Sequence, residues 1–400
     1  MRKSALYLFG LVAASLVALG LVVLCSASQP NAVKWHHGNA FAFFLRQLSF
    51  VAVGILVAAV TAKVDYRIWK NHRVVTWILY FTVFLLLFAV FPPIGHRVNG
   101  SFRWIPLGPI NLQPSEFAKL AIVIVVAMWM DRIGWKSERF GKGVVVPFLL
   151  IAGFIGPILA ETDIGSSVVV ASAGCLMMLL GGTRWLYLIG AAALGGCGVL
   201  AVMLTNANRM RRLAPWLRDA LPSFMAGWFG IEQAAPSAVK KLSEMDSAEY
   251  QVYNSLVAIK NGGLWGVGLG QSMQKQYYLP EAHTDFVMAV GAEELGLVFS
   301  IAVIVLFFLF FGLSVYIGLK ASDRYGRFLA LGMGFIIFFQ AMFNLGVVSR
   351  ALPTKGMALP FFSYGGTNMI AACIAVGVIL SVGIHSYQDK KRTLRRNVCI

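Results

Sequence analysis

The sequence predicts an all-α polytopic membrane protein. We expect ten transmembrane helices, both termini in the cytoplasm, and a large extracytoplasmic loop between helices 7 and 8. Of the 400 residues, 58% are hydrophobic and only 13% are charged, and the mean hydropathy is +0.73. These values exclude a soluble globular protein. Helices are favoured because each satisfies its own backbone polar groups inside a bilayer.

Ten apolar stretches are long enough, at about 20 residues each, to cross the hydrocarbon core. They cover residues 5–27, 44–62, 74–92, 114–130, 144–160, 164–181, 185–205, 286–319, 328–349 and 368–386. The eighth is too long for one simple span, so we expect its first turns to lie at the interface or to re-enter. The chain is predicted to be a single transmembrane domain, 1–400, with an outer loop at 206–285 and a basic cytoplasmic tail at 387–400.

The basic residues are distributed unevenly between the two sets of connecting loops. One set of ends and short loops carries 19 lysine and arginine residues, and the opposite short loops carry 6. The positive-inside rule places both termini in the cytoplasm. The net charge of +17 is therefore mainly a topology signal, and we expect no nucleic-acid partner. The first apolar run is longer than a signal-peptide core, so we expect it to remain as a helix.

Several common functional motifs are missing from the sequence. It contains no phosphate-binding loop of the Gly-x-x-x-x-Gly-Lys-Ser/Thr type, so we expect no nucleotide cofactor. The glycine-rich run 262–270 lacks the strand and helix of a dinucleotide site, and it predicts a tight turn or a close-packing segment. The five cysteines show neither a disulfide framework nor the spacing of metal ligands.

The segment 277–296 concentrates ionisable side chains at the edge of a strongly apolar chain. It holds Glu281, His283, Asp285, Glu293 and Glu294. Ionisable groups are costly in a membrane environment and indicate function. The alternative is an interfacial helix start at which Glu281 and Asp285 face water, but that alternative leaves Glu293 and Glu294 unexplained.

A second polar segment, 97–119, leads into the fourth predicted helix, with Pro114 near its first position. Glu116 and Lys119 are three residues apart and therefore lie on one helix face. They could form an ion pair that satisfies itself inside the bundle, or Lys119 could hold an anionic substrate. The sequence alone leaves these two readings equal.

Two further polar segments lie on the same side of the predicted membrane. The turn 161–163 carries Glu161 and Asp163, and helix capping by Thr162 or Asp163 is the simpler explanation for it. The segment 352–367 is rich in proline and glycine, which disfavours a regular helix. At membrane depth such a segment must be buried in protein or line a cavity.

All four polar segments are predicted to meet at one outward-facing cavity. The ionisable side chains expected to act in this cavity are the carboxylate Asp285 and three candidate cations, Arg103, Lys119 and Lys355. This set suits a displacement in which one base activates a hydroxyl and cations stabilise a phosphate leaving group. Glycoside hydrolysis would instead require two opposed carboxylates. Asp285 could also be the ligand of a divalent cation, Mg²⁺ or Mn²⁺.

Five motifs, in order along the chain, resemble those of one family. They are Arg103-Trp104-Ile105, Gln113-Pro114-Ser115-Glu116, Pro280-Glu281-Ala282-His283-Thr284-Asp285-Phe286, Glu293-Glu294-Leu295-Gly296 and Pro360-Phe361-Phe362-Ser363-Tyr364-Gly365-Gly366. The chain resembles the SEDS (shape, elongation, division and sporulation) family over nearly its whole length. The segments 278–283 and 354–356 are more similar to the division branch of that family than to its elongation branch.

The resemblance implies a peptidoglycan glycosyltransferase that polymerises lipid II on the outer face of the membrane, with inversion expected for a single displacement. It assigns Asp285 as the essential aspartate. Substrate-binding positions are expected at Arg103, Trp104, Glu116, Lys119, Glu281, His283, Lys355, Ser363 and Tyr364. The sequence departs from the family pattern at Thr162, where proline is usual, and at Val287-Met288, where Ile-Phe is usual.

The resemblance also implies partners and a location. The expected partners are lipid II, a class B penicillin-binding protein and other division proteins. The expected location is the bacterial cytoplasmic (inner) membrane, as a multi-pass protein at the division septum. The competing functions are a lipid II flippase or other transporter, an elongation-branch polymerase, and a non-catalytic division scaffold. A transporter would predict polar residues near the bilayer midplane and an internal repeat, neither of which the sequence shows.

Overall fold

The computed structural model describes residues 3–35, 38–90, 96–98, 101–108, 110–134, 138, 140–161, 163–190, 247–276, 278–353 and 356–398. Its longer helices are α1 Lys3–Trp35, α2 Ala42–Lys63, α3 His72–Val90, α4 Pro114–Ile133, α5 Val146–Ala160, α6 Ile164–Gly181, α10 Ser247–Gly262, α11 Val287–Leu319, α12 Arg324–Val348 and α13 Gly366–Val398. The short helical segments η1 Tyr66–Lys70 and η3 Gly141–Val145 precede α3 and α5. Lys355, Thr162 and the first half of the predicted outer loop lie outside the described residues.

Eight helical segments in the described part of the chain are long and apolar enough to cross a membrane. This confirms a polytopic helical membrane protein. The helix α4 coincides with the predicted span 114–130, but it is not among the eight. It carries ionisable residues near both ends, and its apolar middle is buried inside the protein. The predicted span 185–205 begins as a helix at 185–190 and then leaves the described residues, so a total of ten spans stays a prediction.

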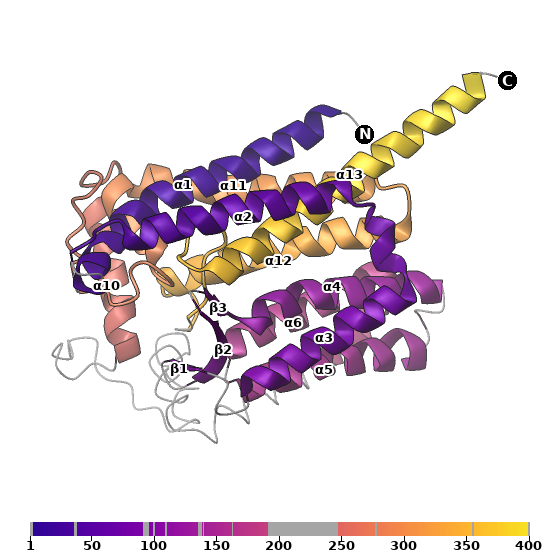
Figure 1. The fold of residues 1–400 in the computed structure, drawn as a ribbon, viewed down its shortest axis with the longest axis horizontal. Coiled ribbons are helices and arrows are strands. Elements are labelled where there is room, and N and C mark those ends of the chain that lie inside the picture. Colours follow the sequence, from indigo (N-terminus) through magenta and orange to yellow (C-terminus); the bar gives the residue numbers. More distant parts are fainter. Residues whose placement is uncertain are drawn as a thin grey trace.

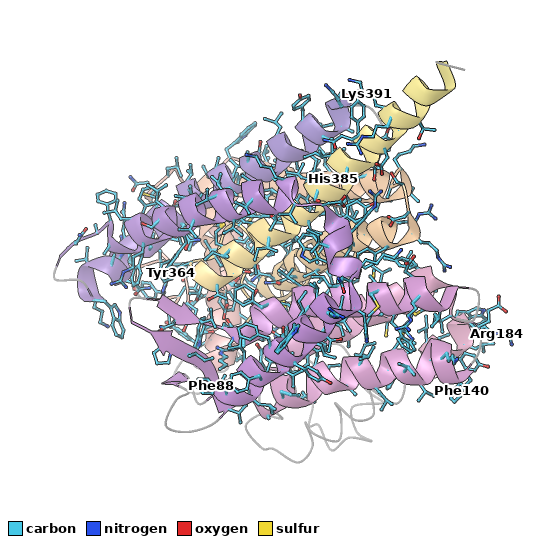
Figure 2. The ribbon with its side chains drawn as sticks, turned by 45° about the vertical axis from the view of Figure 1, so that its right-hand side comes forward. Phe88, Phe140, Arg184, Tyr364, His385 and Lys391 are labelled. Atoms are coloured by element: carbon cyan, nitrogen blue, oxygen red, sulfur yellow. The ribbon has the colours of Figure 1, made fainter. Side chains whose placement is uncertain are left out.

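The helices form two groups that pack side by side (Figure 1). One group contains α1, α2, α11, α12 and α13, and the other contains α3, α4, α5 and α6. The helix α12 joins them, because it packs against α4 and α6 as well as against α11 and α13. Both chain ends lie at the same end of the bundle, as the uneven charge distribution predicts. Figure 2 shows Lys391 and Arg184 toward that end and Tyr364 away from it.

The expectation of a purely helical protein was wrong at one place. Residues 96–112 form a three-stranded antiparallel sheet in the order β1-β2-β3, with β1 at His96–Val98, β2 at Ser101–Leu107 and β3 at Ile110–Leu112. The turn between β2 and β3 contains Gly108 at φ 69, a conformation that glycine adopts without strain. The strands supply one another's backbone partners, because β2 pairs with β1 on one side and with β3 on the other. The sheet leads directly into α4 and places β2 over the end of the bundle (Figure 1).

The long helix α11 is broken at Gly296, which has φ 78. The break agrees with the prediction that this stretch is not one simple span. The glycine-rich segment 263–268 fills the break. The N–H groups of residues 297 and 298 donate to the carbonyls of residues 263 and 264. In the other direction, the N–H groups of residues 267 and 268 donate to the carbonyls of residues 293 and 294. The backbone groups released by the break are thus satisfied, as a membrane protein requires. We call residues 263–268 the glycine strap.

Glycine is required where the strap and the preceding residue, Gly262 at the end of α10, contact α11. A Cβ atom on Gly266 would lie 2.2 Å from the carbonyl oxygen of Glu294, and one on Gly262 would lie 2.0 Å from that of Ala292. Neither backbone oxygen can move away without breaking the helix. The prediction of a close-packing segment at 262–270 is therefore confirmed.

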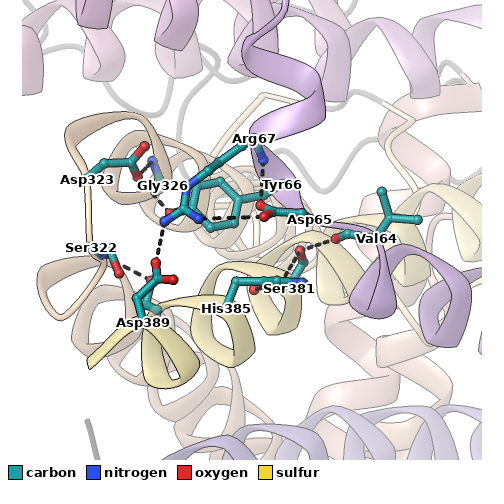
Figure 3. Close-up of polar contacts among 11 residues, drawn as sticks. Val64, Asp65, Tyr66, Arg67, Ser322, Asp323, Gly326, Ser381, His385 and Asp389 are labelled. Carbon is teal, nitrogen blue, oxygen red and sulfur yellow. Dashed lines mark hydrogen bonds and ion pairs between the residues drawn. The ribbon is translucent and has the colours of Figure 1, made fainter. Parts of the chain in front are cut away.

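At the end of the bundle that carries the termini, a polar cluster joins η1, α12 and α13 (Figure 3). The Tyr66 hydroxyl donates to Asp323 Oδ1 at 2.8 Å, and Asp323 also caps α12 by accepting from the N–H of Gly326 at 3.0 Å. Arg67 pairs with Asp389 of α13. These groups pair among themselves on the side of the molecule remote from the four polar segments, so the cluster holds the helices together there.

Candidate functional site

Three consecutive backbone carbonyls fix the segment that leads into α11. The carbonyl of His283 accepts from the N–H of Tyr364 at 2.9 Å. The carbonyl of Thr284 accepts from Ser363 Oγ at 2.6 Å. The carbonyl of Asp285 accepts from Asn344 Nδ2 at 2.8 Å. All three donors come from the C-terminal end of α12 and the loop after it, so this loop anchors the segment that carries Asp285.

The Asp285 carboxylate lies against the backbone of Gly356. A Cβ atom at Gly356 would lie 2.4 Å from Asp285 Oδ2, so any larger residue there would displace the carboxylate from its present position. No side chain in the described part of the protein donates a hydrogen bond to it. Burial, together with the negative charges of nearby Glu281 and Asp163, raises the pKa of Asp285 to about 7, although the positive charge of Arg103 lowers it. A carboxylate with a pKa near neutrality is suited to accept a proton at physiological pH.

Arg103 is the cation that the structure brings toward Asp285. It lies on β2, and its positive charge lowers the pKa values of both Asp285 and Glu161. Its Nε atom is buried and has no hydrogen-bond partner. Trp104 is the next residue on the same strand, and successive side chains of a strand point to opposite faces. The strand therefore directs Arg103 and Trp104 to opposite sides.

The turn between α5 and α6 contributes two carboxyl groups with different environments. Asp163 caps α6, because Oδ1 accepts from the N–H of Ser166 at 3.1 Å and Oδ2 accepts from Ser166 Oγ at 2.8 Å. The capping explanation is thus confirmed for Asp163. Glu161 is fully buried, and neither of its carboxyl oxygens has a hydrogen-bond partner. Burial, with Asp163 nearby, raises its pKa to about 9, so Glu161 is neutral at pH 7.

Replacing Glu161 by Gln should stabilise the protein at neutral pH. The folded protein keeps the Glu161 proton up to about pH 9, whereas the unfolded chain releases it near pH 4.5. Stability therefore falls as pH rises between these two values, and the cost reaches about 3 kcal/mol at pH 7. Thermal unfolding in detergent should show a higher midpoint for Glu161→Gln at pH 7, with the difference from wild type vanishing near pH 4. A difference that is independent of pH would contradict a buried neutral Glu161.

Lys119 is buried in an ion pair inside the bundle. Its Nζ lies 2.8 Å from Glu116 Oε1 and donates to Gln340 Oε1 at 2.7 Å. Gln340 in turn donates to the carbonyl of Ala358 at 2.9 Å. The structure therefore shows the internal ion pair between Lys119 and Glu116. Through Gln340, this pair links α4 to α12 and to the loop after α12. Lys119 as a ligand of an anionic substrate stays a prediction.

The remaining predicted binding residues mostly join the polar segments to one another. Ser363 Oγ accepts from the N–H of Leu359 at 2.7 Å in addition to its bond to residue 284.

His283 is stacked on Phe43 with ring centroids 5.1 Å apart, and burial lowers its pKa. Glu281 accepts from Thr284 Oγ1 at 2.7 Å. Tyr364 packs edge-on against Phe43, so these groups fix the shape of the site.

The segments at 97–119 and 161–163 join this group through further hydrogen bonds. Gln113 Nε2 donates to Asp163 Oδ2 at 3.4 Å, and the N–H of Gln113 donates to Thr367 Oγ1 at 3.3 Å. Residues Gly165 and Gly356 also approach each other. The four polar segments named from the sequence therefore meet at one end of the bundle.

Glu293 and Glu294 bind the loop that follows the glycine strap. Glu294 Oε1 lies 2.8 Å from Lys275 Nζ and accepts from Ser26 Oγ at 2.7 Å. Glu293 accepts from Ser272 Oγ and from the N–H of Gln274. These carboxylates, which the sequence left without a structural explanation, therefore attach the loop 272–275 and α1 to α11.

Among the described residues, no three His, Cys, Asp or Glu side chains lie close enough together to hold a metal ion. Mg²⁺, however, is usually held by one or two carboxylates together with waters and the phosphates of a substrate. Asp285 is the carboxylate that would hold such an ion together with a phosphate-bearing ligand, and the divalent cation stays a prediction.

Comparison with known proteins assigns the chain to a protein family. The chain matches the family described as "Cell cycle protein" (FTSW_RODA_SPOVE) over residues 6–388. The chain therefore belongs to the SEDS family, which comprises the FtsW, RodA and SpoVE proteins.

Within that family, the relatives carry the name of the division branch. The chain is 34% identical to the probable peptidoglycan glycosyltransferase FtsW of Trichlorobacter lovleyi over 372 residues, which is 93% of this chain and 91% of the relative. It is 36% identical to the protein of the same name from Coxiella burnetii over 372 residues, 92% of this chain and 93% of the relative.

Solved structures show the same fold. A chain from a peptidoglycan synthase complex, studied for its structural coordination of polymerization and crosslinking, matches with a TM-score of 0.68 at 23% identity, covering 96% of this chain and 98% of that one. The rod shape determining protein RodA of Thermus thermophilus matches with a TM-score of 0.64 at 23% identity, covering 95% of this chain and 96% of that one.

Proposed function

We propose that this protein is a peptidoglycan glycosyltransferase that polymerises lipid II into glycan strands on the outer face of the bacterial cytoplasmic membrane during cell division. The observation that carries the proposal is the Asp285 carboxylate, which is desolvated, has a pKa near neutrality and has Arg103 as a cationic neighbour. The FtsW names of relatives that match almost the whole chain support the same activity and the division branch.

In the proposed reaction, Asp285 accepts the proton of the 4-hydroxyl of the incoming lipid II. The hydroxyl oxygen forms a bond to C1 of the growing glycan, and the bond from C1 to the undecaprenyl pyrophosphate breaks. A single displacement of this kind inverts the configuration at C1. The pyrophosphate leaves as an anion and needs no general acid, and Arg103 and Lys355 would stabilise the charge that develops on it.

We further propose a class B penicillin-binding protein as partner and the division septum as the site of action. The match to a chain of a peptidoglycan synthase complex supports a partner of this kind. Other division proteins would bring the pair to the septum.

The test is glycan-chain formation from labelled lipid II by the purified protein with its cognate penicillin-binding protein, whose transpeptidase is blocked. A ladder of glycan products is expected. A folded complex that forms no ladder, but moves labelled lipid II across vesicles, would replace the proposal with transport. Adding EDTA and then Mg²⁺ or Mn²⁺ to the same assay tests the divalent cation, because activity lost on chelation should return with the metal.

The rate of glycan polymerisation should rise as the pH increases through about 7, the pKa of Asp285. Only ionised Asp285 can accept the proton, so kcat/KM is expected to fall about tenfold for each pH unit below the pKa of this group. Glu281→Gln removes a negative charge that raises this pKa, so its acid limb should move to lower pH. The pH profiles of wild type and Glu281→Gln check this. Identical acid limbs would show that another group controls the profile.

A further inference from the structure

The side chain of Asn344 joins Asp285 to the loop that faces it. Asn344 lies near the C-terminal end of α12 and is 2% exposed. Its Nδ2 donates to the carbonyl of Asp285 at 2.8 Å and to the carbonyl of Met357 at 2.6 Å. Met357 follows Gly356, the residue against which the Asp285 carboxylate lies. One amide group therefore holds both sides of the contact.

The two partners determine which way the amide points. Both are backbone carbonyl oxygens, which can only accept, so the NH₂ group and not the oxygen must face them. Without the amide, these two oxygens would face each other with like partial charges. No other side chain of the same size provides two donors at this position. Leucine provides none, and aspartate would place a third oxygen there.

The bridge has an unfavourable energetic consequence for the amide oxygen of Asn344. This oxygen is buried and has no hydrogen-bond partner, a state that is unfavourable for a polar atom. An apolar residue would avoid this cost but would lose the bridge. Asn344 does not contact the Asp285 carboxylate itself, so any effect on the reaction must come through the backbone.

We propose that Asn344 is a positioning residue that sets the place of the Asp285 carboxylate over Gly356. This inference rests on the proposed function, in which Asp285 is the base. Misplacing a reacting group by about 1 Å can reduce the rate about 100-fold. Asn344→Leu and Asn344→Asp are therefore expected to lower kcat by about that factor and to change KM for lipid II by less than about 3-fold.

The matched control is Asn254→Leu. Asn254 lies on α10, is also buried, and donates through Nδ2 to the carbonyl of Tyr278 at 3.0 Å. It therefore makes the same kind of bond to the same connecting segment, but seven residues before Asp285. A residue that only stabilises the fold should behave like Asn254, whose substitution is expected to lower the thermal midpoint and leave kcat near that of wild type.

A readout without substrate separates this inference from the proposed function. Carbodiimide labelling of the full-length protein, followed by mass spectrometry, reports the accessibility of each carboxyl group. Asn344→Leu should increase labelling of Asp285 several-fold and leave that of Asp163 unchanged. If wild type made no glycan while this change in labelling appeared, the proposed function would fail and the positioning role would stand. Unchanged labelling of Asp285, or a wild-type kcat in both Asn344 variants, would overturn the positioning role.

Discussion

Substituting Asp285 by Asn is expected to lower the rate of glycan polymerisation by about 10³-fold, within the range that a general base contributes. The amide has the same shape as the carboxylate but cannot accept the proton of the acceptor hydroxyl. The fold should tolerate the change, because the backbone bond from Asn344 to residue 285 does not involve the carboxylate. The measurement is the rate of ladder formation from labelled lipid II in the complex with the transpeptidase-blocked partner.

Glu281→Gln provides the matched control, since it removes one negative charge four residues earlier in the same segment. It should keep far more activity than Asp285→Asn when each is assayed at its own optimal pH. Thermal unfolding should show Asp285→Asn to be at least as stable as wild type, because the raised pKa means that ionised Asp285 is unfavourable in the folded state. An Asp285→Asn protein that polymerises lipid II at the wild-type rate would remove this residue from the mechanism.

The second large effect is on stability. Lys275→Met should destabilise the protein by about 3–5 kcal/mol, because it leaves Glu294 as an unpaired charge in the interior. Lys275 is 4% exposed and Glu294 is 1% exposed, so water cannot replace the lost partner. Thermal and denaturant unfolding in detergent would measure the loss.

A double variant distinguishes a stranded charge from a general loss of packing. Lys275→Met combined with Glu294→Gln should recover most of the stability, because Gln keeps an oxygen that can accept from Ser26 and carries no charge. Lys260→Met on the exposed side of α10 should leave stability within about 0.5 kcal/mol of wild type. If the double variant were as unstable as Lys275→Met alone, the ion pair would not be the source of the effect.

Local patterns in the sequence were sufficient to predict much of the fold and the meeting of the four polar segments. Apolar stretches of membrane length mark the helices, and the proline at 114 marks the start of α4. The excess length of the eighth stretch indicated that it is not one simple span, in agreement with the break in α11 at Gly296. Asp285 stood out as a charged residue at the start of an apolar helix, and no distant partner was needed to recognise it.

The parts that were missed depend on residues far apart in the chain. Glu294 binds Ser26, 268 residues away, and a single sequence gives no sign of that contact. The burial of Glu161 results from packing, whereas the sequence offered only helix capping by Thr162 or Asp163 as the simpler explanation of its turn. The strand that carries Arg103 and Trp104 forms by pairing with β1 and β3, and the sequence analysis interpreted this stretch only as part of the polar segment 97–119.

The glycine strap has a mechanical consequence for a polymerase. A break in a helix often serves as a hinge, but here four backbone hydrogen bonds and two close glycine contacts would have to separate together before α11 could bend. We therefore expect a rigid joint, with the start of α11, which follows Asp285 directly, fixed relative to the rest of that helix. When a glycan strand grows by one unit, we expect the sugar chain to slide past a stationary carboxylate. The product then moves, and the protein segment that acts on it does not.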